Sequence, residues 1–188
     1  VLKPEIRENY PIILQDIFTN TAPLKWRIRK MLASQLKPLC ELYNAESIFK
    51  SINPMAFTCL EDSVSIVRET TVDAVAAMII KMYKAKLDDN ENSMEDNDKT
   101  DHDSIAEWLD SLIDDVIELG KNDKSYYSRQ LFIHITCTLV NSWKYNHNSF
   151  TTDLSFGNLL DCFFNLSNDD VLNVQITLAQ ALTDLPAW

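Results

Sequence analysis

The most constraining feature of this sequence is an apolar stripe that recurs four times with one helical spacing. Each copy advances by 4, 4, 3 and 4 residues as far as it extends, which places its members on one face of an α-helix. Successive copies are offset by 39, 61 and 46 residues. The copies are Ile28, Leu32, Leu36, Leu39 and Tyr43; Val67, Thr71, Val75, Met78 and Met82; Ser128, Phe132, Thr136, Leu139 and Trp143; and Val174, Leu178, Leu182 and Leu185.

Polar residues keep the same register as the stripe. An arginine follows its first position in three copies (Arg29, Arg68, Arg129), and Gln175 takes that place in the fourth. An aspartate stands six residues before the last three of these, and a proline six residues before the first: Asp62, Asp123, Asp169 and Pro23. An aspartate there can accept hydrogen bonds from the N–H groups that open a helix, and proline also suits a helix start. Because an active site does not recur once per structural unit, the pattern predicts capping and ion pairs between repeats.

An apolar segment of helical period precedes each stripe, at Tyr10–Phe18, Ile48–Leu60, Ile105–Leu119 and Leu154–Leu166. Ser104 and Glu107 are spaced as a capping box at the start of the third segment, and Pro54 can kink the second. The repeating unit is therefore a helix pair with a basic period of 39 residues, close to that of HEAT repeats. We predict an all-α fold, a HEAT-repeat α-solenoid of about four antiparallel helix pairs stacked in a right-handed superhelix. The pairs are expected at about 8–44, 47–86, 103–144 and 152–186.

The longest departure from the period coincides with an acidic stretch. Residues 88–103 contain eight acids against Lys99 alone, which accounts for −7 of the net charge of −11. We therefore predict a disordered inter-repeat loop at 87–103. The acidic balance argues against nucleic acid as a partner. With only two glycines, the chain has no phosphate-binding or dinucleotide-binding loop.

The four cysteines, Cys40, Cys59, Cys137 and Cys162, lie far apart within apolar helical patterns. This spacing favours buried reduced thiols over a disulfide or a zinc site, and hence the cytoplasm, the nucleus or both. The longest apolar run, from Ala74 to Ile80, is too short to span a bilayer, so no membrane partner is expected. The chain starts without methionine and stops within an apolar pattern, which suggests an excerpt of a longer protein.

Two stretches carry a family resemblance, Lys25-Trp26-Arg27-Ile28-Arg29 and the run from Leu60 to Glu69. Tyr126-Tyr127-Ser128-Arg129 and the run from Asp169 to Val174 continue it. Together they resemble consecutive C-terminal HEAT repeats of the scaffold (A) subunit of type-2A serine/threonine phosphatases and of the related regulatory subunits of protein phosphatase 4. The resemblance implies a non-catalytic scaffold or regulatory subunit whose partners are a type-2A-like phosphatase catalytic subunit and further regulatory subunits.

In that family, the turns between the two helices of the C-terminal repeats grip the catalytic subunit. The resemblance therefore implies partner contacts in four successive turns. Ser65 stands where the scaffold family carries an aromatic residue, and Gln175 replaces the repeating arginine. The implied contact residues are Lys25, Trp26, Arg27, Val64, Ser65, Tyr126, Arg129, Val171, Leu172 and Asn173.

Trp26 precedes the stripe by two positions, which favours an exposed binding residue over one packed on a neighbouring repeat. His102, His134 and His147 are scattered and have no nucleophile or carboxylate at a motif spacing, and Asp114 with Asp115 is typical of a solvated helix face. We therefore expect no enzyme activity, no metal and no cofactor. A second interpretation stays open: a karyopherin-like HEAT transport receptor or adaptor that binds basic cargo.

Overall fold

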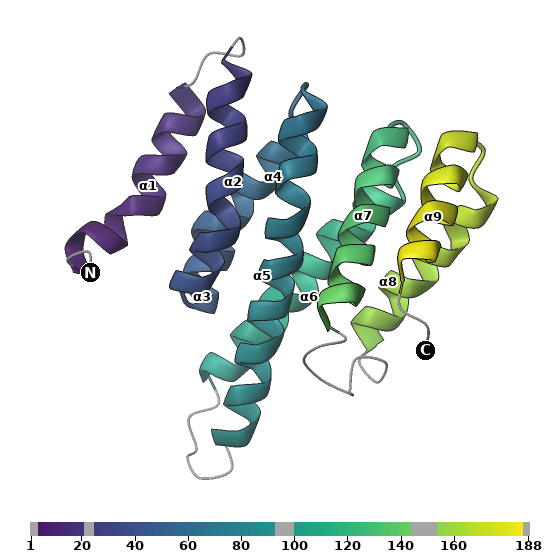
Figure 1. The fold of residues 1–188 in the computed structure, drawn as a ribbon. Helices are drawn as coiled ribbons and strands as arrows, with labels where there is room; N and C mark the ends of the chain where they lie inside the picture. Colours follow the sequence, from purple (N-terminus) through teal and green to yellow (C-terminus); the bar gives the residue numbers. More distant parts are fainter. Residues whose placement is uncertain (1–3, 21–24, 93–99, 144–153, 186–188) are drawn as a thin grey trace. The chain divides into compact units, whose positions relative to one another are not determined.

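The computed structural model describes residues 4–20, 25–92, 100–143 and 154–185. Every regular element among them is helical (Figure 1). The chain divides into two compact units, residues 1–78 and residues 79–188, with the boundary inside one long helix, α5 (Ser65–Asn92). This all-helical repeat architecture confirms the predicted fold class.

The first unit begins with α1 (Pro4–Asn20) and α2 (Trp26–Leu42), which pack on each other. The next helix is interrupted: α3 (Ala45–Ser47) leads into a π-helical turn, η1 (Ile48–Ile52), and then into α4 (Asn53–Leu60). Pro54 explains the interruption that the sequence predicted as a kink, because proline has no N–H and its ring crowds the carbonyl four residues back. The start of α5 completes this unit, tied to α2 by an ion pair between Lys37 and Asp73 at 3.1 Å.

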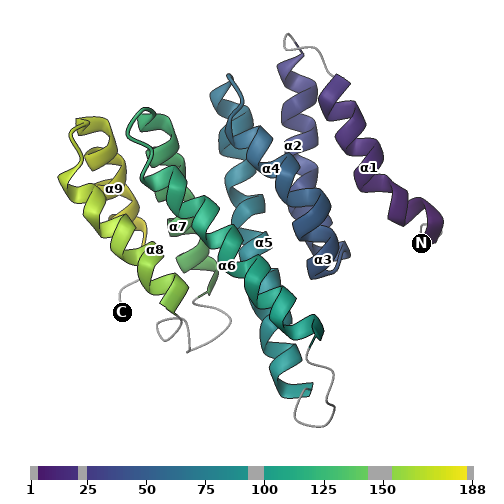
Figure 2. The ribbon, with the colours of Figure 1, turned by 180° about the vertical axis from the view of Figure 1, so that it is seen from behind.

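The second unit contains the end of α5, α6 (Thr100–Gly120), α7 (Tyr126–Trp143), α8 (Leu154–Asn165) and α9 (Leu172–Asp184). A short 3-10 turn, η3 (Leu166–Asn168), joins α8 to the loop before α9. Figures 1 and 2 show two layers here: α7 lies beside α9 in one, and α6 lies beside α8 in the other. The turn between α6 and α7 and the turn between α8 and α9 lie at the same end of these two layers (Figure 1).

Most of the predicted stripe is buried in the core. Leu36, Val75 and Phe132 are at most 2% exposed, and Val174 is fully buried. Ile28 and Leu182 were predicted to be buried, and this is wrong: they are 37% and 42% exposed.

The buried faces of α2 and α9 explain both errors. In α2 the buried face runs through Arg29, Leu32 and Leu36, which leaves Ile28 at its edge. Leu182 directly follows the buried Ala181 and is turned about 100° from it around the helix axis.

Two predicted boundaries differ from the structure. The loop expected at 87–103 is wrong at its edges, because α5 continues to Asn92 and α6 begins at Thr100; residues 93–99 lie outside the described residues. The capping box at Ser104 is also wrong, since Ser104 lies inside α6. Neither 87–92 nor 100–103 contains glycine or proline, so nothing local stops either helix.

Three of the four cysteines, Cys40, Cys59 and Cys137, are buried as predicted, whereas Cys162 is half-buried. Burial raises the pKa of the Cys59 thiol to about 12, against an opposing hydrogen bond with Thr71, so this thiol is chemically inert. None of the described helices combines the length and the apolar character needed to cross a membrane.

Gly120 ends α6 at a point where a side chain would not fit. A Cβ atom there would lie 2.8 Å from the ring of Phe132 and 2.9 Å from the Cys162 sulfur. Phe132 is fully buried and cannot move aside. Gly120→Ala is therefore expected to destabilise the protein by about 1–3 kcal/mol through overpacking. Urea unfolding measures this, with Gly157→Ala as the control because a Cβ at Gly157 meets no atom within 4 Å. Equal stability of the two variants would contradict the close packing.

Candidate partner-binding turns

The turn between α4 and α5 is organised by Asp62. Its carboxylate accepts two hydrogen bonds from the guanidinium of Arg29 in the preceding repeat, at 2.5 and 2.9 Å. It also accepts the backbone N–H of Val64 at 2.9 Å, while its own carbonyl accepts Nη1 of Arg68 at 2.6 Å. Asp62 thus stabilises the turn and the start of α5, and it links this repeat to the preceding one.

Asp169 repeats this arrangement between α8 and α9. Its carboxylate accepts Arg129 of the preceding repeat at 2.6 and 2.9 Å and the N–H of Val171 at 2.8 Å. Its carbonyl accepts Nε2 of Gln175 at 2.7 Å. Gln175 therefore makes the same hydrogen bond to the carbonyl of its turn aspartate that Arg68 makes to the carbonyl of Asp62. The predicted capping and repeat-to-repeat ion pairing are confirmed at both turns.

The turn between α6 and α7 departs from the predicted register by one residue. Asn122, not Asp123, holds this turn: its side-chain oxygen accepts the N–H of Lys124 at 3.1 Å, and its carbonyl accepts Nη1 of Arg129 at 2.7 Å. Asp123 is exposed, so the prediction that it receives the helix-opening hydrogen bonds is wrong. Ser125 supplies the cap instead, because its hydroxyl accepts the N–H of Ser128 at 3.2 Å.

Both ion pairs are removed from water, since the side chains of Arg29, Asp62, Arg129 and Asp169 are 5–8% exposed. The hydrogen bond from Arg29 holds the pKa of the Asp62 carboxyl below its usual value, although burial opposes this shift. At Asp169 burial is the larger influence and acts to raise the pKa. The hydrogen bonds from Arg129 and Val171 together outweigh it, so the pKa of Asp169 is also lowered.

Acidification is therefore expected to destabilise the chain through these two carboxyls. Their pKa values are lower in the folded chain than in the unfolded chain, so the unfolded chain takes up protons first as the pH falls. The stabilisation is fully present well above the unfolded value of about 3.9 and is lost as the pH falls through that value and then through the folded pKa. Thermal melts between neutral and acidic pH measure it.

The variant for that measurement is Asp62→Asn with Asp169→Asn, whose melting temperature should depend less steeply on pH in the acidic range. Asp170→Asn removes an exposed neighbouring carboxylate and serves as the control. If the variant and the wild type show the same pH dependence, the two ion pairs do not govern acid stability.

Residues from the first two implied contact turns lie at the openings of α2 and α5. Lys25 and Arg27 are exposed and Trp26 is half-buried, so its predicted exposure in the turn is only partly correct. α2 begins at Trp26, and the Arg27 guanidinium stacks over the indole at 4.6 Å from the ring centroid. Val64 is half-buried and Ser65 is exposed.

The third and fourth implied turns both lie in the second unit. Leu172 is 66% exposed, Asn173 is exposed, and Val171 and Tyr126 are half-buried. Arg129 is different: it is 6% exposed, and its guanidinium is occupied by Asp169 and by the Asn122 carbonyl. The structure therefore assigns Arg129 a structural role in place of the implied partner contact, because its guanidinium donors are directed inward to Asp169 and Asn122.

Two residues outside the implied set also belong to this surface. Tyr127 is 49% exposed and stacks on Tyr126, with ring centroids 3.9 Å apart. Gln130 links α7 to α9 by donating to the Asn173 carbonyl at 3.3 Å and the Thr177 hydroxyl at 2.8 Å. No repeated position marks Gln130 in the sequence, since this link depends on how α7 packs on α9.

Comparison with known proteins agrees with the resemblance carried by these turns. No family model and no solved structure matches the chain. The relatives it matches include the "Serine/threonine-protein phosphatase 4 regulatory subunit 1" of Homo sapiens, Mus musculus and Rattus norvegicus, at 25%, 25% and 26% identity over 176 residues. The match covers 94% of this chain but only 16% of each relative. The chain is thus similar, over nearly its whole length, to a segment of a phosphatase regulatory subunit, as its repeated turns predict.

Proposed function

We propose that this chain is a segment of a non-catalytic scaffold or regulatory subunit that binds a type-2A-like serine/threonine phosphatase catalytic subunit through its intra-repeat turns. The observation that carries the proposal is the similarity to a protein phosphatase 4 regulatory subunit over 94% of the chain. It fits the sequence pattern, in which the helix-opening residues of successive turns carry the resemblance.

The organisation of the turns supports a binding role. Asp62 and Asp169 each hold a turn with four hydrogen bonds, so the residues that follow are presented by a rigid backbone. A preorganised surface loses little conformational entropy on association. Residues on such turns can reach a partner without disturbing the buried stripe.

The exposed residues at the turns have the chemistry of interface anchors. At the opening of α9, Leu172 offers an apolar side chain that is 66% exposed. At the opening of α7 in the same unit, Tyr126 and Tyr127 form a stacked aromatic pair. Trp26 and Arg27 form a cation–π pair at the opening of α2. Tryptophan, tyrosine and arginine are enriched among the residues that dominate binding energy.

The test is binding of the protein phosphatase 4 catalytic subunit to Leu172→Ala with Asn173→Ala. We expect at least about a tenfold loss of affinity, because truncating a buried interface anchor costs about 2 kcal/mol or more. Leu182→Ala with Thr183→Ala is the matched control, since these residues are exposed on the same helix away from the turn. Titration calorimetry on the full-length protein gives the affinities, and melts show that both variants fold.

A second variant, Trp26→Ala with Arg27→Ala, tests the turn in the other unit and is expected to weaken the same complex. Wild-type affinity in both turn variants would refute the proposed surface. Purification of the full-length protein tests the assignment of the partner itself. A stoichiometric phosphatase catalytic subunit supports the proposal, whereas a small GTPase or a basic cargo protein favours the karyopherin-like alternative.

A further inference from the structure

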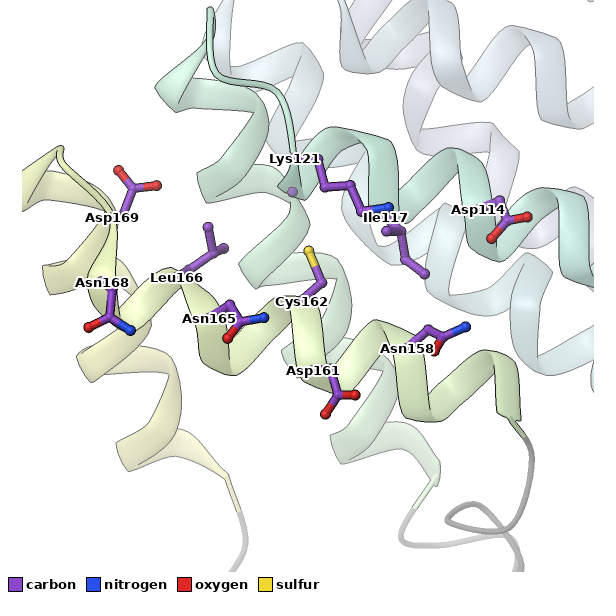
Figure 3. A pocket seen from close by; sticks show the side chains of 11 residues that line it. Asp114, Ile117, Lys121, Asn158, Asp161, Cys162, Asn165, Leu166, Asn168 and Asp169 are labelled. Carbon is purple, nitrogen blue, oxygen red and sulfur yellow. The ribbon is translucent and has the colours of Figure 1, made fainter.

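A groove of about 440 Å³ lies between α6 and α8 in the second unit, in the layer formed by these two helices (Figure 3). Asp114 and Ile117 point from α6 toward α8, while Asn158 and Cys162 point from α8 toward α6. Ile117 and Leu166 are buried and give the groove a narrow apolar floor. The rest of the lining is mostly polar.

Five of the polar side chains that line this groove are not used by the fold. The carboxylates of Asp114 and Asp161 and the side-chain amides of Asn158, Asn165 and Asn168 make no hydrogen bond to another described residue. Each of these five residues is exposed. Side-chain amides offer both a donor pair and an acceptor, which is the complement of a peptide main chain. The groove thus presents unused peptide-binding chemistry along its length.

The spacing of the amides suits an extended chain. Asn158, Asp161, Cys162 and Asn165 follow one another at the i, i+3, i+4 and i+7 positions that share one face of α8. Seven residues of helix separate the amides of Asn158 and Asn165 by about 10 Å along the axis. About three residues of an extended peptide span that distance.

The charge around the groove is negative. The exposed carboxylates of Asp114, Asp115 and Glu118 lie along α6, and Asp161 lies on α8 at the rim. Lys121, the cation that lines the groove, lies 3.5 Å from Glu118, so its charge is partly offset. This field disfavours an anionic ligand and attracts Lys and Arg, whose aliphatic stems can cover Ile117 and Leu166.

We propose that the α6–α8 groove binds an extended, basic peptide segment of a partner protein. The amides of Asn158 and Asn165 hydrogen-bond its main chain, and Asp114 and Asp161 bind its lysine or arginine side chains. None of the proposed phosphatase-binding residues lines this groove, and its test contains no phosphatase. Failure of one proposal therefore leaves the other standing.

Fluorescence anisotropy tests the binding, with a short labelled peptide in which alanine alternates with lysine or arginine as the probe. We expect saturable binding of this peptide to the chain, weakening as salt is added. The same peptide with glutamate at each basic position should not bind. Absence of binding by the basic peptide overturns the proposal.

Cys162 locates the bound peptide. It lines the groove and is the half-buried cysteine, whereas the other three are buried. Burial raises the pKa of the Cys162 thiol, so iodoacetamide labelling is run in mildly alkaline buffer. The basic peptide should slow Cys162 alkylation, as read by mass spectrometry. Binding that leaves the alkylation rate unchanged places the peptide elsewhere and overturns the proposal.

Two matched charge reversals complete the test. Asp114→Lys with Asp161→Lys is expected to weaken binding about tenfold or more, because it removes two charge-assisted contacts. Glu107→Lys with Asp184→Lys changes the net charge equally at exposed positions outside the groove lining and should have a much smaller effect. Asn158→Ala with Asn165→Ala should weaken binding with no change in charge. Equal losses in the two charge reversals show attraction to the acidic surface as a whole, which overturns the groove as the site.

Discussion

Replacing Arg129 with methionine is expected to destabilise the folded chain by about 3–5 kcal/mol, because it leaves the Asp169 carboxylate buried without its cation. The Asp169 side chain is 6% exposed, and its carboxylate accepts hydrogen bonds from the Arg129 guanidinium and from the backbone N–H of Val171. Methionine retains most of the arginine's aliphatic volume, so the loss reports on the guanidinium's contacts with Asp169 and the Asn122 carbonyl and not on a cavity. Urea unfolding monitored by circular dichroism gives the free energy of unfolding.

A double-mutant cycle with Asp169→Asn separates the ion pair from the helix cap. Asparagine can still accept the N–H of Val171, so this change removes the charge and keeps the cap. The loss in the double variant should be clearly smaller than the sum of the two single losses, since the second substitution no longer strands a buried charge. Additive losses would show that Arg129 and Asp169 do not interact energetically.

The exposed ion pair between Lys37 and Asp73 provides the control. Its distance is 3.1 Å, but the two side chains are 52% and 57% exposed. Lys37→Met should therefore change stability by at most about 1 kcal/mol. A loss as large as that of Arg129→Met would mean that burial is not what makes the Arg129 pair important.

Leu36→Ala is expected to destabilise the chain by about 2–5 kcal/mol, through lost apolar burial and the cavity that remains. Leu36 is 2% exposed at the centre of the buried face of α2. Leu42→Ala is the matched control on the same helix, because Leu42 is 53% exposed and a surface truncation changes stability by about 0.5 kcal/mol or less. Both variants are measured by urea unfolding. Similar losses for the two leucines would contradict the assigned face of α2.

Several features of the fold were predictable because they depend on residues close together in the chain. The spacing of Leu32, Leu36 and Leu39 predicts one buried helix face, and its recurrence predicts a stack of similar helix pairs. The aspartates at two of the turns, Asp62 and Asp169, were predicted for the same reason, since each binds an N–H group only two residues further along the chain. The resemblance to phosphatase regulatory subunits also lies in these short stretches.

The sequence by itself therefore determined the helix pairs, their order and the repeated turn, because helical periodicity and capping act over a few residues. Only the tertiary structure decided which residues these elements bring together. Arg29 binds Asp62, which lies 33 residues further along the chain, and Arg129 points inward to Asp169. Asp114 of α6 and Asn158 of α8 line the same groove. These contacts depend on how one helix pair stacks on the next, and the period of an apolar stripe carries no information about the distance between side chains on neighbouring helices.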